Sequence, residues 1–200
     1  MDPKKIFIIG HSMGAMLAPR IDEEGGDFAG LILMAGTPRK LEEVLIEQTE
    51  EVLSSLTGFA RKLGEKQAQQ LRRTFDGLYE MTDEQAVKKK VGGGTTLYYF
   101  KEMGQRPVSG YLTQLQKPIL ILQGDKDFQV KADRDFEAYR EILKEHPNAV
   151  FRLYKDLNHC FVPSVYGSIS KAKQEYNIEQ HISPQVIADI ADWIVNGSNV

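Results

Sequence analysis

The sequence predicts an α/β fold, in which a mostly parallel sheet is flanked by helices and carries a helical cap insertion. Short apolar runs alternate along the chain with segments of helical periodicity, and strands that alternate with helices form parallel sheets through right-handed crossovers. The stretch 37–115 interrupts this alternation with helix-forming sequence. A chain of 200 residues suits one domain, 1–200, with the cap at about 37–115.

Four segments have the pattern of strands: 5–9, 29–35, 118–123 and 149–154. The first three are nearly continuous apolar runs, which indicates burial on both faces of the sheet. The fourth alternates and contains Arg152, so it is expected nearer an edge. Helical patterns cover 13–24, 131–145 and 184–196. Pro19 lies inside the first of these helices and is expected to bend it.

The interrupting stretch contains two apolar stripes at helical spacing, one within 40–56 and one within 59–90. Three glycines, 92–94, and an aromatic cluster, 98–100, follow them. Helices inserted between two strands predict a cap over a site at the sheet. The glycines are compatible with a hinge or with simple loop flexibility. The aromatic residues are expected to pack in a core, and the alternative is that they line an acyl or aryl pocket.

Gly10-His11-Ser12-Met13-Gly14 joins the first apolar run to the first helix. This G-x-S-x-G pattern predicts a nucleophile elbow, a turn so tight that glycine is expected at both flanking positions. Such a turn presents the Ser12 hydroxyl at a helix N-terminus, where the Met13 N–H can form half of an oxyanion hole. The alternative is an ordinary serine in a glycine-rich turn that contacts phosphate. The two common phosphate-loop patterns are absent from the sequence, which weakens that alternative.

A serine hydroxyl becomes an effective nucleophile when a base accepts its proton and a carboxylate orients that base. The third strand is followed by Asp125 and Asp127, and the fourth by His159. We expect Asp127 to be the orienting acid and His159 the base, in the chain order serine, acid, histidine. Asp125 is placed to accept from the turn backbone. The alternative role for both aspartates is turn formation or helix capping, for which Asp133 is the better candidate.

The other potential ligands are scattered along the chain. The His11 ring is expected to point away from the site, while His146 and His181 are expected at helix ends or on the surface. The sequence contains one cysteine, Cys160, and no H-E-x-x-H spacing. No metal and no cofactor are therefore expected.

Composition excludes several classes of protein. The net charge of −3 argues against a nucleic-acid partner. No apolar run approaches the ~20 residues that span a bilayer, so no membrane partner is expected. A signal-peptide apolar region and a disulfide framework are both missing from the sequence. These observations predict a cytoplasmic location.

The segments GHSMGA, ILILQGDKDFQV and LYKDLNHCF together resemble the α/β-hydrolases. The resemblance covers essentially the whole chain and is strongest to bacterial esterases of the dienelactone-hydrolase and prolyl-oligopeptidase-like branch. It implies that Ser12, Asp127 and His159 are nucleophile, acid and base. The implied activity is cleavage of a small-molecule carboxylic ester, or of a short acyl or peptidyl substrate, through an acyl-enzyme. Acyl transfer to an alcohol stays open.

The front of the chain departs from this family. The resemblance implies further strands and helices before the elbow strand, which carry the second oxyanion-hole donor, and therefore that this sequence corresponds to the C-terminal part of a hydrolase. The strand edge at Ile6–Ile9 would then be bare, which favours pairing with another copy in a homodimer or higher oligomer. We expect weak turnover unless a partner subunit supplies the second donor. The alternatives are a non-catalytic remnant that folds and dimerises, and a module that binds a small ligand.

Overall fold

The computed structural model describes residues 5–197 and contains two compact units. One unit combines the chain up to Pro38 with the chain from Val108 onward, and the other is Arg39–Pro107. The first unit contains the sheet and the second is helical. The helical insertion is thus shorter than the expected 37–115, because 108–112 forms a helix that packs in the sheet unit. The role of the insertion as a cap stays a prediction.

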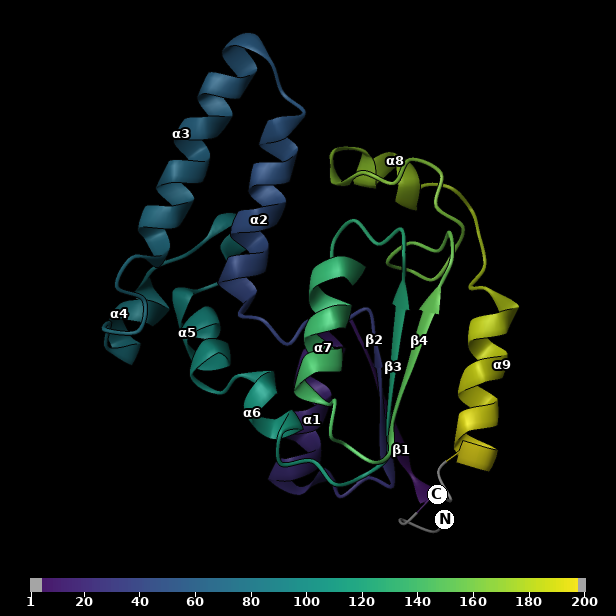
Figure 1. Cartoon of the computed structure of the whole chain (residues 1–200). Coiled ribbons are helices and arrows are strands. Elements are labelled where there is room, and N and C mark those ends of the chain that lie inside the picture. Colours follow the sequence, from purple (N-terminus) through teal and green to yellow (C-terminus); the bar gives the residue numbers. More distant parts are fainter. Residues whose placement is uncertain (1–4, 198–200) are drawn as a thin grey trace. The chain divides into compact units, whose positions relative to one another are not determined.

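Within residues 5–197, four parallel strands form a sheet in the order β1-β2-β3-β4 (Figure 1). They are β1 (Phe7–His11), β2 (Gly30–Met34), β3 (Ile119–Gly124) and β4 (Ala149–Tyr154). The predicted parallel sheet flanked by helices is confirmed. The first strand extends beyond the expected 5–9, because Gly10 and His11 continue the ladder opposite Leu33 and Met34.

Burial across the sheet follows strand position. Every residue of β2 and β3 is buried, as predicted from their apolar runs. The same prediction was wrong for β1, where the Ile9 side chain is 52% exposed. Since β1 pairs with β2 alone among the described strands, it is an edge strand. The opposite edge is β4, where Arg152 and Leu153 are exposed.

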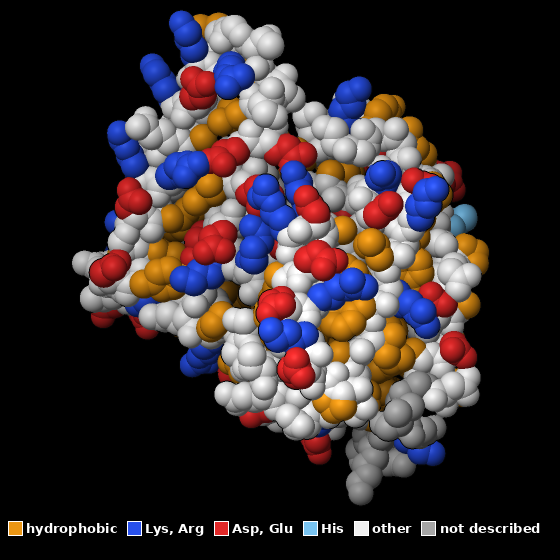
Figure 2. All heavy atoms as spheres, viewed as in Figure 1, with side chains coloured by type: hydrophobic (Ala, Val, Ile, Leu, Met, Phe, Trp, Pro, Cys, Tyr) orange, Lys and Arg blue, Asp and Glu red, His pale blue; other side chains and the backbone are white. Residues whose placement is uncertain are grey.

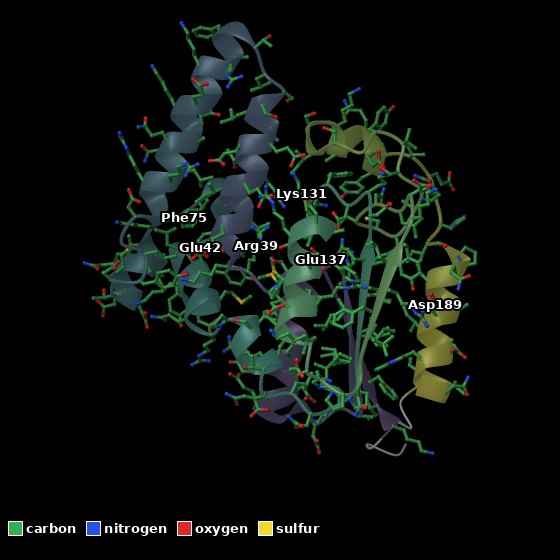
Figure 3. The ribbon with its side chains drawn as sticks, in the orientation of Figure 1. Arg39, Glu42, Phe75, Lys131, Glu137 and Asp189 are labelled. Atoms are coloured by element: carbon green, nitrogen blue, oxygen red, sulfur yellow. The ribbon has the colours of Figure 1, made fainter. Side chains whose placement is uncertain are left out.

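Helices cover both faces of the sheet. In Figure 1, α7 lies on one side of β3 and β4, α9 lies on the other, and α8 lies beyond the ends of these strands. Trp193, directly after α9, packs edge-on against Phe7 of β1. The Tyr154 hydroxyl donates at 2.8 Å to Asp189, which lies on α9 (Figure 3). The helical segments of this unit are α1 (Met13–Ile21), η2 (Asp22–Gly26), α6 (Val108–Leu112), η4 (Ala132–Phe136), α7 (Glu137–Ile142), η5 (Ile169–Lys171), α8 (Ala172–Tyr176), α9 (Pro184–Asp192) and η6 (Trp193–Gly197).

The second unit has its own small core. Phe100 is 5% exposed and meets Phe75 at a ring distance of 5.0 Å, while Tyr98 is 37% exposed. Core packing is therefore the role of Phe100, and the partly buried Tyr99 packs against the same cluster. Basic side chains are spaced along the outer side of α3 (Figure 2). The helical segments are α2 (Leu41–Ser54), α3 (Gly58–Phe75), α4 (Asp83–Lys88), η3 (Gly92–Gly94) and α5 (Leu97–Gln105).

None of the helices within residues 5–197 is both long enough and apolar enough to cross a membrane.

The two glycines of the elbow differ in the space around them. A Cβ at Gly10 would lie 2.2 Å from the Gly14 carbonyl oxygen, whereas one at Gly14 meets no described atom within 4 Å. The prediction that both flanking positions need glycine is thus confirmed at Gly10 and wrong at Gly14.

We expect Gly10→Ala to lower the free energy of unfolding by about 1–3 kcal/mol, the usual cost of overpacking. The measurement is urea unfolding followed by circular dichroism. Gly14→Ala is the matched control and should change stability by less than about 1 kcal/mol. Equal losses in the two variants would contradict the assignment of the tight approach to Gly10.

Candidate active site

Ser12 occupies the strained turn between β1 and α1. Its backbone has φ 54° and ψ −115°, a conformation that costs a non-glycine residue about 1–3 kcal/mol. The Ser12 N–H donates to the Met34 carbonyl at 2.8 Å, and the Ser12 carbonyl accepts from Ala15 N at 3.0 Å. These bonds fix the turn to the end of β2 and to the first turn of α1. Met13, whose N–H is the expected oxyanion donor, is the first residue of that helix.

A buried histidine–carboxylate pair lies at the carboxyl ends of β3 and β4. His159 Nδ1 is 2.8 Å from Asp127 Oδ2, and the two side chains are 6% and 0% exposed. Asp127 follows β3 and His159 follows β4, which are neighbouring parallel strands. Because the carboxyl ends of parallel strands share one edge of the sheet, two residues distant in sequence meet there. The structure therefore brings together the predicted acid and base.

The hydrogen bond from His159 to Asp127 fixes the tautomer of the neutral His159 imidazole. Asp127 Oδ1 accepts from Gln129 N at 2.8 Å and from Val130 N at 3.0 Å, and Asp127 Oδ2 also accepts from Gln123 Nε2 at 2.8 Å. A carboxylate is an acceptor, so His159 Nδ1 is the donor in their shared bond. The neutral imidazole then has its lone pair on Nε2, as a general base requires.

Gln123 is a site residue that the sequence reasoning missed. It is 1% exposed, at the end of β3, and its side-chain amide donates to Asp127 and to the Val130 carbonyl at 3.1 Å. The available signal was an amide side chain at the end of the apolar run 118–122. A buried polar side chain in such a strand needs a partner, and the carboxylate four residues later is that partner.

The His11 ring contacts the His159 loop, so the prediction that it points away from the site was wrong. Its Nε2 donates to the His159 carbonyl at 2.8 Å, and the two ring centroids are 4.9 Å apart. The Ser12 hydroxyl makes no hydrogen bond to His159 within residues 5–197. Catalytic hydrogen bonds are often long without substrate and tighten when it binds. The elbow and the acid–base pair are thus adjacent through His11.

The remaining predicted residues lie outside this cluster. Asp125 Oδ1 accepts from Asp156 N at 2.7 Å, so it joins the turns after β3 and β4 as a turn-backbone acceptor. The prediction of Asp133 as a helix cap was wrong, because Asp133 lies inside η4, exposed, and the N-cap position is Lys131, which makes no side-chain cap hydrogen bond. His146 forms a turn before β4 and His181 is exposed before α9, as predicted.

Cys160, next to His159, is not poised as a competing nucleophile. Burial raises the pKa of its thiol, and the Asp127 carboxylate raises it further. The thiolate is the reactive form of cysteine, so this environment keeps Cys160 unreactive at neutral pH.

The cavity beside the acid loop is a poor candidate for the substrate site. Its volume is about 440 Å³, and neither Ser12 nor His159 lines it. The lining residues, of which Figure 3 labels Lys131 and Glu137, are Asp125, Asp127, Lys131, Ala132, Asp133, Glu137 and Leu153. Across the described part of the chain, no three histidine, cysteine, aspartate or glutamate side chains gather closely enough to hold a metal ion.

A parallel sheet flanked by helices, with a serine elbow between a strand and the helix that follows it, is the arrangement of the α/β-hydrolases. Residues 2–162 match the sequence model of the Hydrolase_4 family, described as serine aminopeptidase S33, and the chain belongs to this family. The predicted superfamily is thereby confirmed, whereas the dienelactone-hydrolase and prolyl-oligopeptidase-like branch stays a prediction.

Similar proteins include esterases. The esterase EstD of Thermotoga maritima is 27% identical over 194 residues, which are 97% of this chain and 43% of that protein. An esterase of Pyrococcus furiosus superposes with a TM-score of 0.51 at 12% identity, over 96% of this chain and 54% of that one. A second crystal form of that esterase gives a TM-score of 0.50 at 12% identity, with 95% and 52% covered. The chain thus spans about half the length of these relatives.

Proposed function

We propose that this chain carries the catalytic residues of a serine hydrolase that cleaves a carboxylic ester through an acyl-enzyme. The observation that carries the proposal is the buried His159–Asp127 pair. The His159 ring contacts the ring of His11, the residue directly before the strained Ser12. Nucleophilic catalysis needs a serine held clear of the backbone and a base whose tautomer a carboxylate fixes, and this chain has both parts. Esterases among the similar proteins support the choice of substrate.

In the proposed acylation step, Ser12 Oγ attacks the ester carbonyl carbon while His159 Nε2 accepts its proton. Asp127 keeps its bond to the Nδ1 proton and stabilises the imidazolium. The carbonyl oxygen becomes an oxyanion, to which the Met13 N–H donates at the N-terminal end of α1. The imidazolium then gives its proton to the leaving alcohol, and the acyl group stays on Ser12.

In the deacylation step, His159 Nε2 accepts a proton from water, and the resulting nucleophile attacks the acyl carbon. The acid leaves as His159 returns the proton to Ser12 Oγ, which restores the starting state. The same three residues can cleave a short peptide, and the serine aminopeptidase description of the family favours this as the second candidate substrate. Membership of the dienelactone-hydrolase and prolyl-oligopeptidase-like branch and a cytoplasmic location belong to the proposal as well.

A fluorophosphonate probe tests the proposal directly, because it forms a covalent bond only with an activated serine. We expect labelling of the purified chain, mapped by mass spectrometry to Ser12, together with slow hydrolysis of p-nitrophenyl acetate. A folded chain, by circular dichroism, that takes up no probe would favour the non-catalytic remnant. Stabilisation against heat by a small ligand, without labelling or hydrolysis, would favour a binding module.

We also propose that a second copy of the chain covers the outer edge of β1. Ala29 N donates to the Ile6 carbonyl and Ser12 N to the Met34 carbonyl. The backbone N–H and C=O groups of the even-numbered residues of β1 therefore point toward β2, and those of the odd-numbered residues point outward from the sheet edge. No other described strand pairs with this outer edge. An open, apolar strand edge is a template for pairing with an identical strand.

Light scattering at micromolar concentration should therefore report a dimer or a higher oligomer. Ile9→Lys places a charge on the open edge and should shift the chain toward the monomer. The matched control is Leu153→Lys, at a side chain of similar exposure (50%) on the opposite edge strand. A wild-type monomer, or equal effects of the two substitutions, would remove the β1 interface.

A further inference from the structure

A buried carboxylate lies under the loop that carries His159. Glu175 of α8 is 1% exposed. Its Oε1 accepts from Asn158 Nδ2 at 2.9 Å and from Val165 N at 3.0 Å, and its Oε2 accepts from Tyr166 N at 2.6 Å. All three donors are neutral, so the buried charge is stabilised by hydrogen bonds rather than by a cation. Such a carboxylate is expensive to bury and holds its donors firmly in place.

Asn158 connects Glu175 to the residues on both sides of His159. It is fully buried, and while its Nδ2 donates to Glu175, its Oδ1 accepts from Cys160 N at 2.9 Å. Its own backbone N–H donates to the Val162 carbonyl at 2.9 Å. The two atoms of the Asn158 amide thus bond to different groups, and an acceptor at residue 175 selects the orientation in which the oxygen faces Cys160.

We propose that Glu175 is a positioning residue, which fixes the loop that carries His159 through Asn158. This inference rests on the proposed function, because the group being positioned is the proposed base. His159 has to keep Nδ1 on Asp127 while Nε2 reaches Ser12, and a displacement of about 1 Å at such a group can cost roughly 10²-fold in rate. Figure 1 shows α8 beyond the ends of β3 and β4, on the side from which it can hold this loop.

The ionisation of Glu175 is consistent with an acceptor-only role. Burial by itself raises the pKa of this carboxyl, but the hydrogen bonds from Asn158, Tyr166 and Val165 outweigh burial and lower the pKa below its ordinary value. Glu175 is therefore a carboxylate at neutral pH. A glutamine there would turn an amide donor toward at least one of the three donors and leave a buried clash.

The test replaces Glu175 by glutamine and uses Glu179→Gln, at an exposed carboxylate three residues beyond α8, as the matched control. We expect Glu175→Gln to lower kcat for p-nitrophenyl acetate by about tenfold or more with little change in KM. We also expect the low-field NMR signal of the His159 Nδ1 proton to broaden or vanish. Glu179→Gln should leave both readouts at wild-type values. An unchanged His159 signal in Glu175→Gln would overturn the proposal.

Asn158→Ser tests the path through the loop and carries the test alone if Glu175→Gln does not fold. Serine can still accept from Cys160 N, two residues on, but is too short to reach Glu175. We expect the same loss of the His159 signal, and no further loss in the double variant, because both changes break one connection. Additive losses, or a wild-type signal in Asn158→Ser, would overturn the proposal. The NMR arm needs no turnover, so a chain that fails to label at Ser12 would remove the proposed function while still reporting on Glu175.

Discussion

Ser12→Ala should abolish fluorophosphonate labelling and reduce any ester hydrolysis by the chain to the background rate. Removal of Oγ leaves the buried His159–Asp127 pair without a group to deprotonate, so no acyl-enzyme can form. Losses for a missing triad nucleophile reach about 10⁶-fold in kcat. The measurements are the second-order rate of labelling and the release of p-nitrophenol under excess substrate.

The Ser12→Ala substitution should leave the fold intact. Ser12 has a positive φ, which alanine tolerates no better than serine does, so the unfolding free energy should change by less than about 1 kcal/mol. Ser170→Ala, at an exposed serine, is the control and should label like the wild type. Persistent labelling of Ser12→Ala at the wild-type rate would mean that another side chain is the nucleophile.

Asp127→Asn should lower the labelling rate by roughly 10⁴-fold, as expected when the orienting acid of such a triad becomes an amide. Two backbone N–H groups, of Gln129 and Val130, bond to Oδ1, so the amide oxygen of asparagine should take that position. Its NH₂ would then face Gln123 Nε2 and His159 Nδ1. His159 would then have to accept from this NH₂ with an unprotonated Nδ1 and carry its own proton on Nε2. A protonated Nε2 could not accept the Ser12 proton.

Asp125→Asn is the matched control for that substitution. Asp125 lies in the same loop but accepts a backbone N–H from Asp156, and an asparagine oxygen can replace that acceptor. We therefore expect little change in labelling. If the two variants lost activity equally, the loop as a whole would matter and the specific bond from Asp127 to His159 would not.

The sequence was sufficient to predict the sheet and the acid–base pair because both depend on local patterns and on chain order. An apolar run marks each strand, and the residues directly after β3 and β4 must meet at one edge of a parallel sheet. Asp127 and His159 could be chosen on that basis without knowledge of any side-chain contact. The open edge of β1 was expected from the family resemblance, whereas the apolar pattern of this strand had predicted burial on both faces.

The supporting residues could not be predicted in this way. The role of Glu175 depends on the connection 155–171 between β4 and α8, which folds back onto α8 through the backbone N–H groups of Val165 and Tyr166. Nothing in local periodicity sets that path. The His11 ring depends on the register of β1 against β2, which places it beside the His159 loop. A shift of one residue in this register would turn the ring to the other face of the sheet.

The point at which the helical unit enters the chain has a consequence for how this protein can vary. The chain leaves the sheet unit after Pro38 and returns to it at Val108. β2 and β3 therefore pair across the inserted helical unit, which adds no strand to the sheet. For a flexible connection, the entropy of closing such a loop rises only logarithmically, by about 0.6 kcal/mol for each doubling of its length. Descendants of this gene could lengthen, shorten or exchange the inserted helical unit at small thermodynamic cost to the sheet. The speed at which β2 finds β3 would be affected more, because distant pairings slow folding.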